Sequence, residues 1–177
     1  MASVRLFWVA VALAGLLLAP RVAAQPETYV VRGDTNIGSY AVKVDGTLLG
    51  AQRAFGRATL LKGRYGCTGR WPALGLRIDF YNLGGHDPCT PQYGYFSSAV
   101  MTGERWRTAR GLAIGDASRK LFSLYSNAPN FRQRGQWFWL LTRYTRIGDG
   151  GYYPGLEAKV VNGIVVAFRV SYAAGGD

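Results

Sequence analysis

Beyond its first 24 residues, the sequence alternates apolar and polar positions in short segments. Leu76, Ile78 and Phe80 alternate with Arg77 and Asp79, and this period of two predicts a strand with one face in the core. Apolar, aromatic and β-branched residues predict further strands over Tyr29–Arg32, Tyr40–Val44, Tyr93–Met101 and Gln136–Tyr144.

The clearest local signal is a hairpin near the C-terminus. Leu156–Val161 and Ile164–Tyr172 flank Asn162-Gly163, a pair that tolerates the two positive φ angles of a type I′ turn. In the second strand, the side chains expected to share one face are Val166, Phe168, Val170 and Tyr172.

Two short amphipathic helices are expected. Thr47 caps the first, which extends to Phe55 and closes at Gly56 in a left-handed conformation. Asp116 is the expected N-cap of the second, which ends near Asn127 before Pro129. Its apolar stripe is formed by Ala117, Leu121, Leu124 and Tyr125.

The order of these elements predicts an α+β fold made of two related halves. The halves span about 25–103 and 104–177, and each packs a short helix on an antiparallel sheet. The segment carrying Cys67 and Trp71 is expected to be a loop, as is Gly84–Pro91. No Pro- or Ser-rich linker separates the halves, so we expect a single mature domain.

The second helical segment also carries a resemblance. Leu112-Ala113-Ile114-Gly115-Asp116 followed by the apolar stripe resembles the opening of small exported helix-on-sheet modules. These are the outer-membrane assembly lipoprotein module and, in tandem form, the β-lactamase-inhibitory proteins, and the resemblance implies a tandem helix-on-sheet fold. The chain departs from it because only the first half has a cysteine pair and the second helix ends in Ser126-Asn127, not glycine. No inhibitor contact is carried over. The whole chain also resembles secreted proteins of actinobacterial type, which implies no function.

Residues 1–24 have the pattern of a cleavable signal peptide. Arg5 precedes an apolar run from Leu6 to Ala19, shorter than the roughly 20 apolar residues that span a bilayer. Pro20 and then Val22-Ala23-Ala24 form a small-residue exit. We therefore expect residues 25–177 to be secreted, without a transmembrane anchor after processing.

The composition is strongly basic, with a net charge of +11 over the full sequence. Such a charge favours acidic partners: an anionic wall polymer, an anionic membrane surface, nucleic acid or an acidic protein. A charge that serves solubility alone is an equal alternative. The two cysteines, Cys67 and Cys89, are expected to form a disulfide in an exported protein.

The sequence lacks the catalytic residues that several classes of enzyme require. The single histidine of the mature chain, His86, is expected on the surface of the disulfide loop and not in a catalytic triad. No metal site and no cofactor motif is found. A wall- or carbohydrate-directed hydrolase using a pair of carboxylates stays open, because ten Asp and Glu residues are present.

Arginines interleaved with aromatic residues are the best remaining signal. Trp106 stands between two arginines, while Trp137 and Trp139 are expected to share a core-facing side of their strand. The candidate binding residues are Arg132, Arg134, Arg143, Arg146, Tyr152 and Tyr153. The sequence thus favours a secreted, non-catalytic binding or inhibitor-like module, with the hydrolase and a purely structural exported domain as alternatives.

The exported protein should begin at or near Gln25, because the apolar run and small-residue exit direct cleavage after Ala24. N-terminal sequencing of the exported protein checks this. Secreted material that still starts at Met1 would show that residues 1–24 are no signal peptide.

Overall fold

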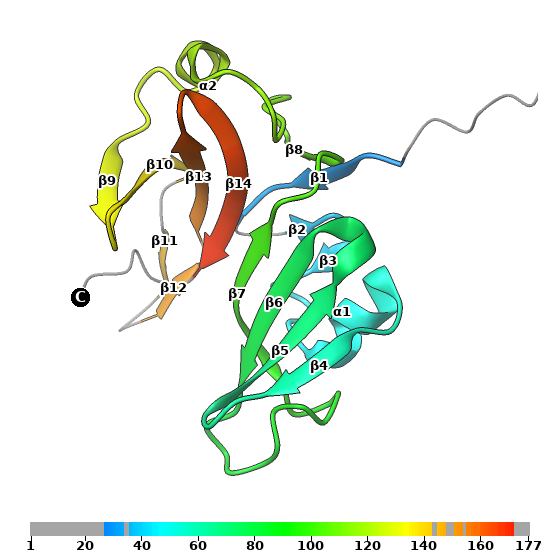
Figure 1. The fold of residues 1–177 in the computed structure, drawn as a ribbon. Coiled ribbons are helices and arrows are strands. Elements are labelled where there is room, and N and C mark those ends of the chain that lie inside the picture. The colour runs from blue at the N-terminus through cyan, green and yellow to red at the C-terminus, as the bar shows by residue number, and fades with distance from the viewer. Residues whose placement is uncertain (1–26, 34–35, 143–144, 148–150, 154, 172–177) are drawn as a thin grey trace, which may run out of the picture.

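A computed structural model describes residues 27–33, 36–142, 145–147, 151–153 and 155–171, with the backbone alone for 145–147 and 151–153. The fold is α+β, as the sequence predicts (Figure 1). The two α-helices are α1 (Leu48–Phe55) and α2 (Ser118–Leu124), and a 3₁₀ turn covers Pro72–Leu74.

An eight-stranded antiparallel sheet forms the centre of the molecule. Its strands, in spatial order, are β4 (Thr59–Lys62), β5 (Gly66–Trp71), β6 (Leu76–Tyr81), β7 (Tyr95–Met101), β14 (Ile164–Ser171), β13 (Gly155–Val161), β10 (Gln136–Thr142) and β9 (Asn130–Gln133). β4 and β9 therefore lie at the edges of this sheet, and β7 and β14 pair in its middle.

Two smaller sheets complete the fold. The first has the order β3 (Tyr40–Ala41), β2 (Asn36–Ile37), β1 (Tyr29–Val31) and β8 (Trp106–Thr108). Its β1–β8 pair is parallel, so two segments that are far apart in the sequence lie side by side. The second is the pair β11 (Thr145–Ile147) and β12 (Gly151–Tyr153).

Each helix is tied to the sheet in the same way. The Leu48 N–H at the start of α1 donates to the Gly94 carbonyl (2.8 Å), and the Ser118 N–H at the start of α2 donates to that of Gly163 (2.7 Å). The return bonds also correspond, from Phe96 to Gly46 (2.7 Å) and from Val165 to Asp116 (2.9 Å). That the two halves are related repeats stays a prediction.

The helices cover one face of the large sheet. Its inward side chains include Ile78, Ala99, Met101, Phe168 and Val170, all fully buried with Leu48 and Leu121 of the helices. Trp106 is also fully buried, and its indole N–H donates to the Leu74 carbonyl (2.8 Å). Trp106 therefore belongs to the core and not to an arginine-flanked binding surface.

The predicted loop around Cys67 and Trp71 is wrong, because this segment is strand β5. Cys67, Gly69 and Trp71 point inward, and Thr68 and Arg70 point outward. Glycine lowers β propensity and hides the period of two, and pairing along the whole length of β6 overrides that propensity. Strands β4, β8 and β9 are likewise absent from the prediction, while the predicted strand Tyr40–Val44 is shortened to Tyr40–Ala41.

The predicted helix cap and hairpin turn, which depend on residues close together in the sequence, are confirmed. Thr47 caps α1 by accepting the Gly50 N–H (3.0 Å), and Gly56 ends it with φ +80°, although its ψ of −172° is not that of a left-handed helix. Asn162 and Gly163 turn the β13–β14 hairpin with φ of 50° and 76°. Phe168 and Val170 face the core as predicted, but a register shift near Val160 turns Val165 inward in place of Val166; Tyr172 lies outside the described residues.

Asp116 does not cap α2. The N-cap is Ala117, which has no side-chain cap bond, and the Asp116 carboxylate turns back to accept the Ala113 N–H (2.7 Å) and bind Lys120 (2.8 Å). Burial alone would raise the pKa of Asp116, but hydrogen bonds from Lys120 and Ala113, with the charges of Lys120 and Arg107, hold it below its usual value.

The predicted disulfide is present. Cys67 in β5 and Cys89 in the β6–β7 loop are bonded, across a sequence separation of 22 residues. Cys67 is buried beneath the sheet, so the bond holds this loop (Asn82–Gly94) against the core.

Replacing both cysteines by serine should lower the free energy of unfolding by about 3 kcal/mol, because a loop of this length loses its covalent closure. Denaturant unfolding of the oxidised protein and the variant checks this. Two alkylatable thiols in native protein, or equal stabilities, would contradict it.

Asp116→Asn should lower stability by about 1 kcal/mol near neutral pH, because a charge-assisted bond to Lys120 is lost. A depressed folded-state pKa stabilises above the unfolded pKa, and that contribution is lost as pH falls through the folded pKa. The difference between wild type and variant should therefore vanish in acid, below the ordinary aspartate value of 3.8. Unfolding curves from pH 7 downward test this, with exposed Glu104→Gln as the control; a difference that persists undiminished in strong acid would refute it.

Candidate functional site

We call the face of the eight-stranded sheet opposite the helices the open face. Its side chains are exposed on β5 and β6, at Arg70, Arg77 and Tyr81, whereas Phe138 and Glu157 on β10 and β13 are buried. Cross-strand pairing places one residue from each of six neighbouring strands in a single row across it. From β5 to β10 the row consists of Arg70, Arg77, Val100, Arg169, Glu157 and Leu140. Three arginines separated in sequence thus lie on one surface.

Arg169 is neutralised within the protein. Its Nε donates to the fully buried Glu157 carboxylate, and its Nη1 donates to the Gln133 side chain. The guanidinium also lies 4.3 Å from the centre of the Phe138 ring. A buried carboxylate requires such a partner, so Glu157 and Arg169 act as a structural pair that links β13 to β14.

Arg70 and Arg77 carry an excess of positive charge. They lie directly opposite each other on β5 and β6, an arrangement that is unfavourable for like charges. Arg77 lies 3.3 Å from Asp79, which also accepts hydrogen bonds from Thr68 and Ser98. Within the described part of the chain, no carboxylate lies within ion-pair distance of Arg70.

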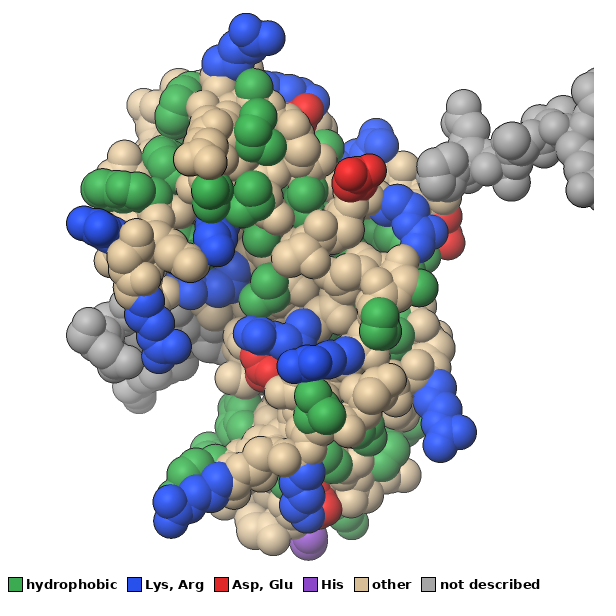
Figure 2. Space-filling model, viewed as in Figure 1, with side chains coloured by type: hydrophobic (Ala, Val, Ile, Leu, Met, Phe, Trp, Pro, Cys, Tyr) green, Lys and Arg blue, Asp and Glu red, His purple; other side chains and the backbone are tan. Residues whose placement is uncertain are grey.

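A pocket of about 370 Å³ opens beside these two arginines. Its other lining residues are Pro72, Gly75, Leu76, Val100 and Thr102. Figure 2 shows Lys and Arg side chains, with an acidic side chain among them, near the middle of this side of the molecule, next to a hollow. The local surface is therefore basic, with apolar walls.

Tyrosines continue the open face toward one end of β6 and β7. Tyr81 and Tyr95 are paired and are 37% and 47% exposed. The adjoining β6–β7 loop is fixed by its disulfide and by Asn82, which binds the Gly84 and His86 N–H groups and the Tyr93 carbonyl. Exposed tyrosines thus lie on the same face as the arginine pair, four residues farther along β6 and on a rigid support.

His86 lies on the surface of this loop, as expected, with its ring stacked on Tyr93 at 4.2 Å. The neighbouring Asp87 is engaged elsewhere: it accepts hydrogen bonds from the Lys62 ammonium (2.6 Å) and the Cys89 N–H (2.9 Å). The bond from Lys62, with that from Cys89, lowers the pKa of Asp87. In this arrangement Asp87 does not orient the histidine.

The predicted binding residues are only partly located. Arg132 and Arg134 are exposed but separate: Arg132 pairs across from Trp137 on the helix-covered side, and Arg134 lies in the β9–β10 turn with φ +47°. Arg134 lines a pocket of about 320 Å³ on the open face with Gln133, Gln136, Phe138 and Arg169.

The remaining predicted residues cannot be placed by their side chains. Arg143 lies outside the described residues. For Arg146, Tyr152 and Tyr153 the structure describes the backbone in β11 and β12, where Arg146 pairs with Tyr152. Their role in binding stays a prediction.

Trp137 and Trp139 are both expected in the core, but only Trp139 lies there. Trp139 packs against the core and contacts Phe122 of α2, with ring centres 6.1 Å apart. Trp137 is 47% exposed, because it lies at the β9–β10 turn end of β10, two residues farther from the helix contact.

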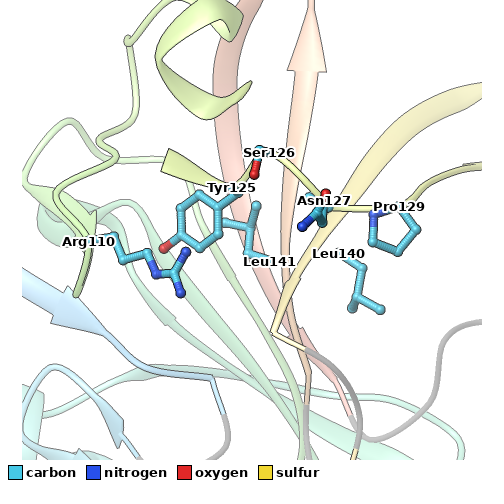
Figure 3. Close-up of a pocket in the computed structure, with 8 residues that line it drawn as sticks. Arg110, Tyr125, Ser126, Asn127, Pro129, Leu140 and Leu141 are labelled. Carbon is cyan, nitrogen blue, oxygen red and sulfur yellow. The ribbon is translucent and has the colours of Figure 1, made fainter. Parts of the chain in front are cut away.

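A second pocket, which we call the edge pocket, lies between the end of α2 and β10 (Figure 3). It has a volume of about 230 Å³. Its lining residues are Arg110, Tyr125, Ser126, Asn127, Ala128, Pro129, Leu140 and Leu141. Figure 3 shows Arg110 on one side, Asn127 and Pro129 on the other, and Tyr125 and Leu141 between them.

Arg70, Arg77 and Arg110 are not predicted as site residues by the sequence. Arg77 has the alternation of an ordinary solvated strand face, and Arg70 lies in the segment expected to be a loop. An arginine before a glycine, as at Arg110-Gly111, and a polar pair after a helix, as at Ser126-Asn127, are both too common to indicate a pocket.

No helix among the described residues is both long and apolar enough to cross a membrane. The same part of the chain contains no group of three or more His, Cys, Asp or Glu side chains arranged to hold a metal ion.

Comparisons with known proteins leave the family open. No family model and no curated protein matches the chain. A solved structure of an extracellular protein containing an SCP domain from Bacillus anthracis str. Ames is similar over 85% of this chain, with a TM-score of 0.45 and 8% sequence identity. The match spans 50% of that protein's chain.

Proposed function

We propose that this chain is a secreted, non-catalytic binding module that holds an acidic protein surface against its open face. The observation that carries the proposal is the pair Arg70 and Arg77, placed opposite each other with an excess of positive charge. The same face exposes the paired Tyr81 and Tyr95 at the other end of β6 and β7. Arginine and tyrosine are the residues in which the binding energy of protein interfaces is concentrated.

An acidic partner would relieve the repulsion between the two arginines. A guanidinium binds a carboxylate through two parallel hydrogen bonds, and the apolar walls formed by Val100 and Pro72 lower the local dielectric and strengthen such a bond. A protein partner is favoured over a long polyanion because the two arginines form a compact pair on a face that also exposes tyrosines, not a continuous basic stripe.

The proposal includes two related halves, joined into one wide surface. The matching bonds at the start of α1 and α2, and the order of strands that mirrors about β7 and β14, support a repeat. Val42 and Leu112, which precede the two helices by similar distances, are both buried. A repeat joined through its last strands produces one sheet that is wider than either half.

The hydrolase alternative is less well supported. The acids on the open face that could form a pair are Asp79 and Glu157, and both are already hydrogen-bonded within the protein. They lie on β6 and β13, with β7 and β14 between them, which is about 14 Å along the sheet at the usual strand spacing. Glycosidase carboxylates are about 5 to 10 Å apart.

Secretion rests on the signal-like pattern of residues 1–24 and on the disulfide. Disulfides form and persist in oxidising compartments outside the cytoplasm. A rigid, cross-linked loop beside the tyrosines also suits a binding surface, because less conformational entropy is lost when a partner binds.

Immobilised poly-L-glutamate should retain the protein at low salt, and the double variant Arg70→Gln/Arg77→Gln should bind about tenfold more weakly. The matched control is Arg53→Gln/Arg119→Gln, which removes the same charge from exposed positions on α1 and α2, the helices that cover the opposite face of the sheet. Binding isotherms at low and high salt measure the effect, since exposed charges are screened within about 8 Å at physiological ionic strength.

Equal weakening of both double variants would show that net charge alone is responsible and would overturn the open face as the site. Stronger retention on anionic wall polymer, anionic vesicles or DNA than on poly-L-glutamate would overturn the acidic protein partner. Hydrolysis of wall polymer that Glu157→Gln or Asp79→Asn abolishes would replace the proposal by the hydrolase.

A further inference from the structure

The edge pocket combines an anchored arginine with hydrogen-bonding groups that the fold does not use. We propose that it binds a small carboxylate, either free or as the C-terminal carboxylate of a peptide, with an adjoining apolar group. This site does not depend on the open face, because none of the residues proposed there as contacts lines it.

Arg110 is held in place from two directions. Its Nη1 donates to the Leu124 carbonyl at the end of α2 (2.8 Å), and its guanidinium carbon lies 5.0 Å from the centre of the Tyr125 ring. No carboxylate of the described chain lies within ion-pair distance of it. The arginine is therefore preorganised, with its charge available to a ligand.

Tyr125 is itself fixed. Its hydroxyl donates to Thr108 Oγ1 (2.8 Å), and burial raises the pKa of the phenol despite that bond and the nearby charge of Arg110. The ring is therefore an uncharged platform for the guanidinium near neutral pH.

The other polar groups in the pocket are Ser126 and Asn127. Both are exposed, and neither side chain is hydrogen-bonded to any described residue. A hydroxyl and an amide can each donate to a carboxylate oxygen. Together with Arg110 they supply the donors that a carboxylate needs, and no acidic side chain is among the lining residues.

Apolar side chains form the rest of the wall, from Pro129, Leu140 and Leu141. The Leu140 N–H donates to the Pro129 carbonyl (2.9 Å), which holds the segment after α2 against β10. A register shift between Leu140 and Thr142 bends β10 at this point, and such bulges redirect side chains next to binding sites.

A second pocket of about 270 Å³ adjoins the edge pocket at Arg110. The two share Arg110, Tyr125 and Leu141, and the neighbour adds Arg32 and the apolar Val31 and Leu156. Neither lining contains an acid. A carboxylate at Arg110 would therefore have apolar walls for a short side chain on either side.

The size and donors favour a carboxylate over a phosphate group. A volume of about 230 Å³ is below that of a site for a drug-sized ligand. One forked guanidinium with an amide and a hydroxyl matches two carboxylate oxygens, whereas a phosphate dianion has three oxygens and stronger demands for positive charge.

Nuclear magnetic resonance titration of the ¹⁵N-labelled exported protein tests the site with N-acetyl-leucine. The Nε–Hε signal of Arg110 and the side-chain amide signals of Asn127 should shift and saturate. N-acetyl-leucinamide, which has no carboxylate, should bind at least about tenfold more weakly, as should inorganic phosphate. Binding of N-acetyl-Ala-Ala-Leu more tightly than N-acetyl-leucine identifies a peptide C-terminus as the ligand, and equal binding identifies a free carboxylate.

Arg110→Lys keeps the charge but loses the forked geometry and should weaken N-acetyl-leucine about tenfold. Asn127→Ala should weaken it severalfold with unchanged thermal stability, because it breaks no bond among described residues; Arg119→Lys on the exposed side of α2 is the control. No saturable shift, equal binding of the amide, tighter binding of phosphate, or wild-type affinity in Asn127→Ala and Arg110→Lys would overturn the proposal. Loss of retention on poly-L-glutamate in the open-face variant, with N-acetyl-leucine binding intact, would confirm that the two sites are separate.

Discussion

The pairing of β7 with β14 is the interaction on which the rest of the structure depends. It joins strands that are far apart in the sequence, Ser98–Met101 with Phe168–Ser171, and so converts two four-stranded groups into one sheet. Gly94 and Gly163 directly precede these two strands. Their carbonyls accept hydrogen bonds from the first N–H groups of α1 and α2. Helix placement and the core beneath the sheet both follow from this central pair.

That pairing also distributes the charges. By placing Arg169 beside Val100 and Glu157 beside Arg169, the register buries one ion pair in the second half. In the first half, the hairpin of β5 and β6 places Arg70 against Arg77 with only Asp79 nearby. The charge is therefore distributed unevenly over the open face. Arg169 and Glu157 neutralise each other, whereas Arg70 and Arg77 keep an excess of positive charge.

The disulfide and the loop it fixes have a complementary role. Cys67 is buried in β5, and Cys89 lies in the loop that presents His86 and Tyr93. The Pro91 carbonyl in the same loop accepts the Leu49 N–H of α1. One end of the open face is thereby made rigid by a covalent bond and by contact with the helix, which suits a surface that binds without rearrangement.

The sequence by itself determined the elements whose causes are local. Alternation defined β6, Thr47 defined the start of α1, and Asn162-Gly163 defined the last hairpin, because each depends on residues within a few positions of one another. The disulfide followed from there being two cysteines in a chain with an export-type start. The α+β class followed from the order of these elements.

Only the tertiary structure decided what depends on register between distant strands. The glycine-containing segment Gly66–Trp71 is a strand because it pairs with β6, although its propensity is weak. The meeting of Arg70 with Arg77, the burial of Glu157 against Arg169, and the edge pocket around Arg110 join residues from separate elements. No local pattern encodes such neighbours, because cross-strand partners are fixed by how the sheet is assembled and not by spacing along the chain.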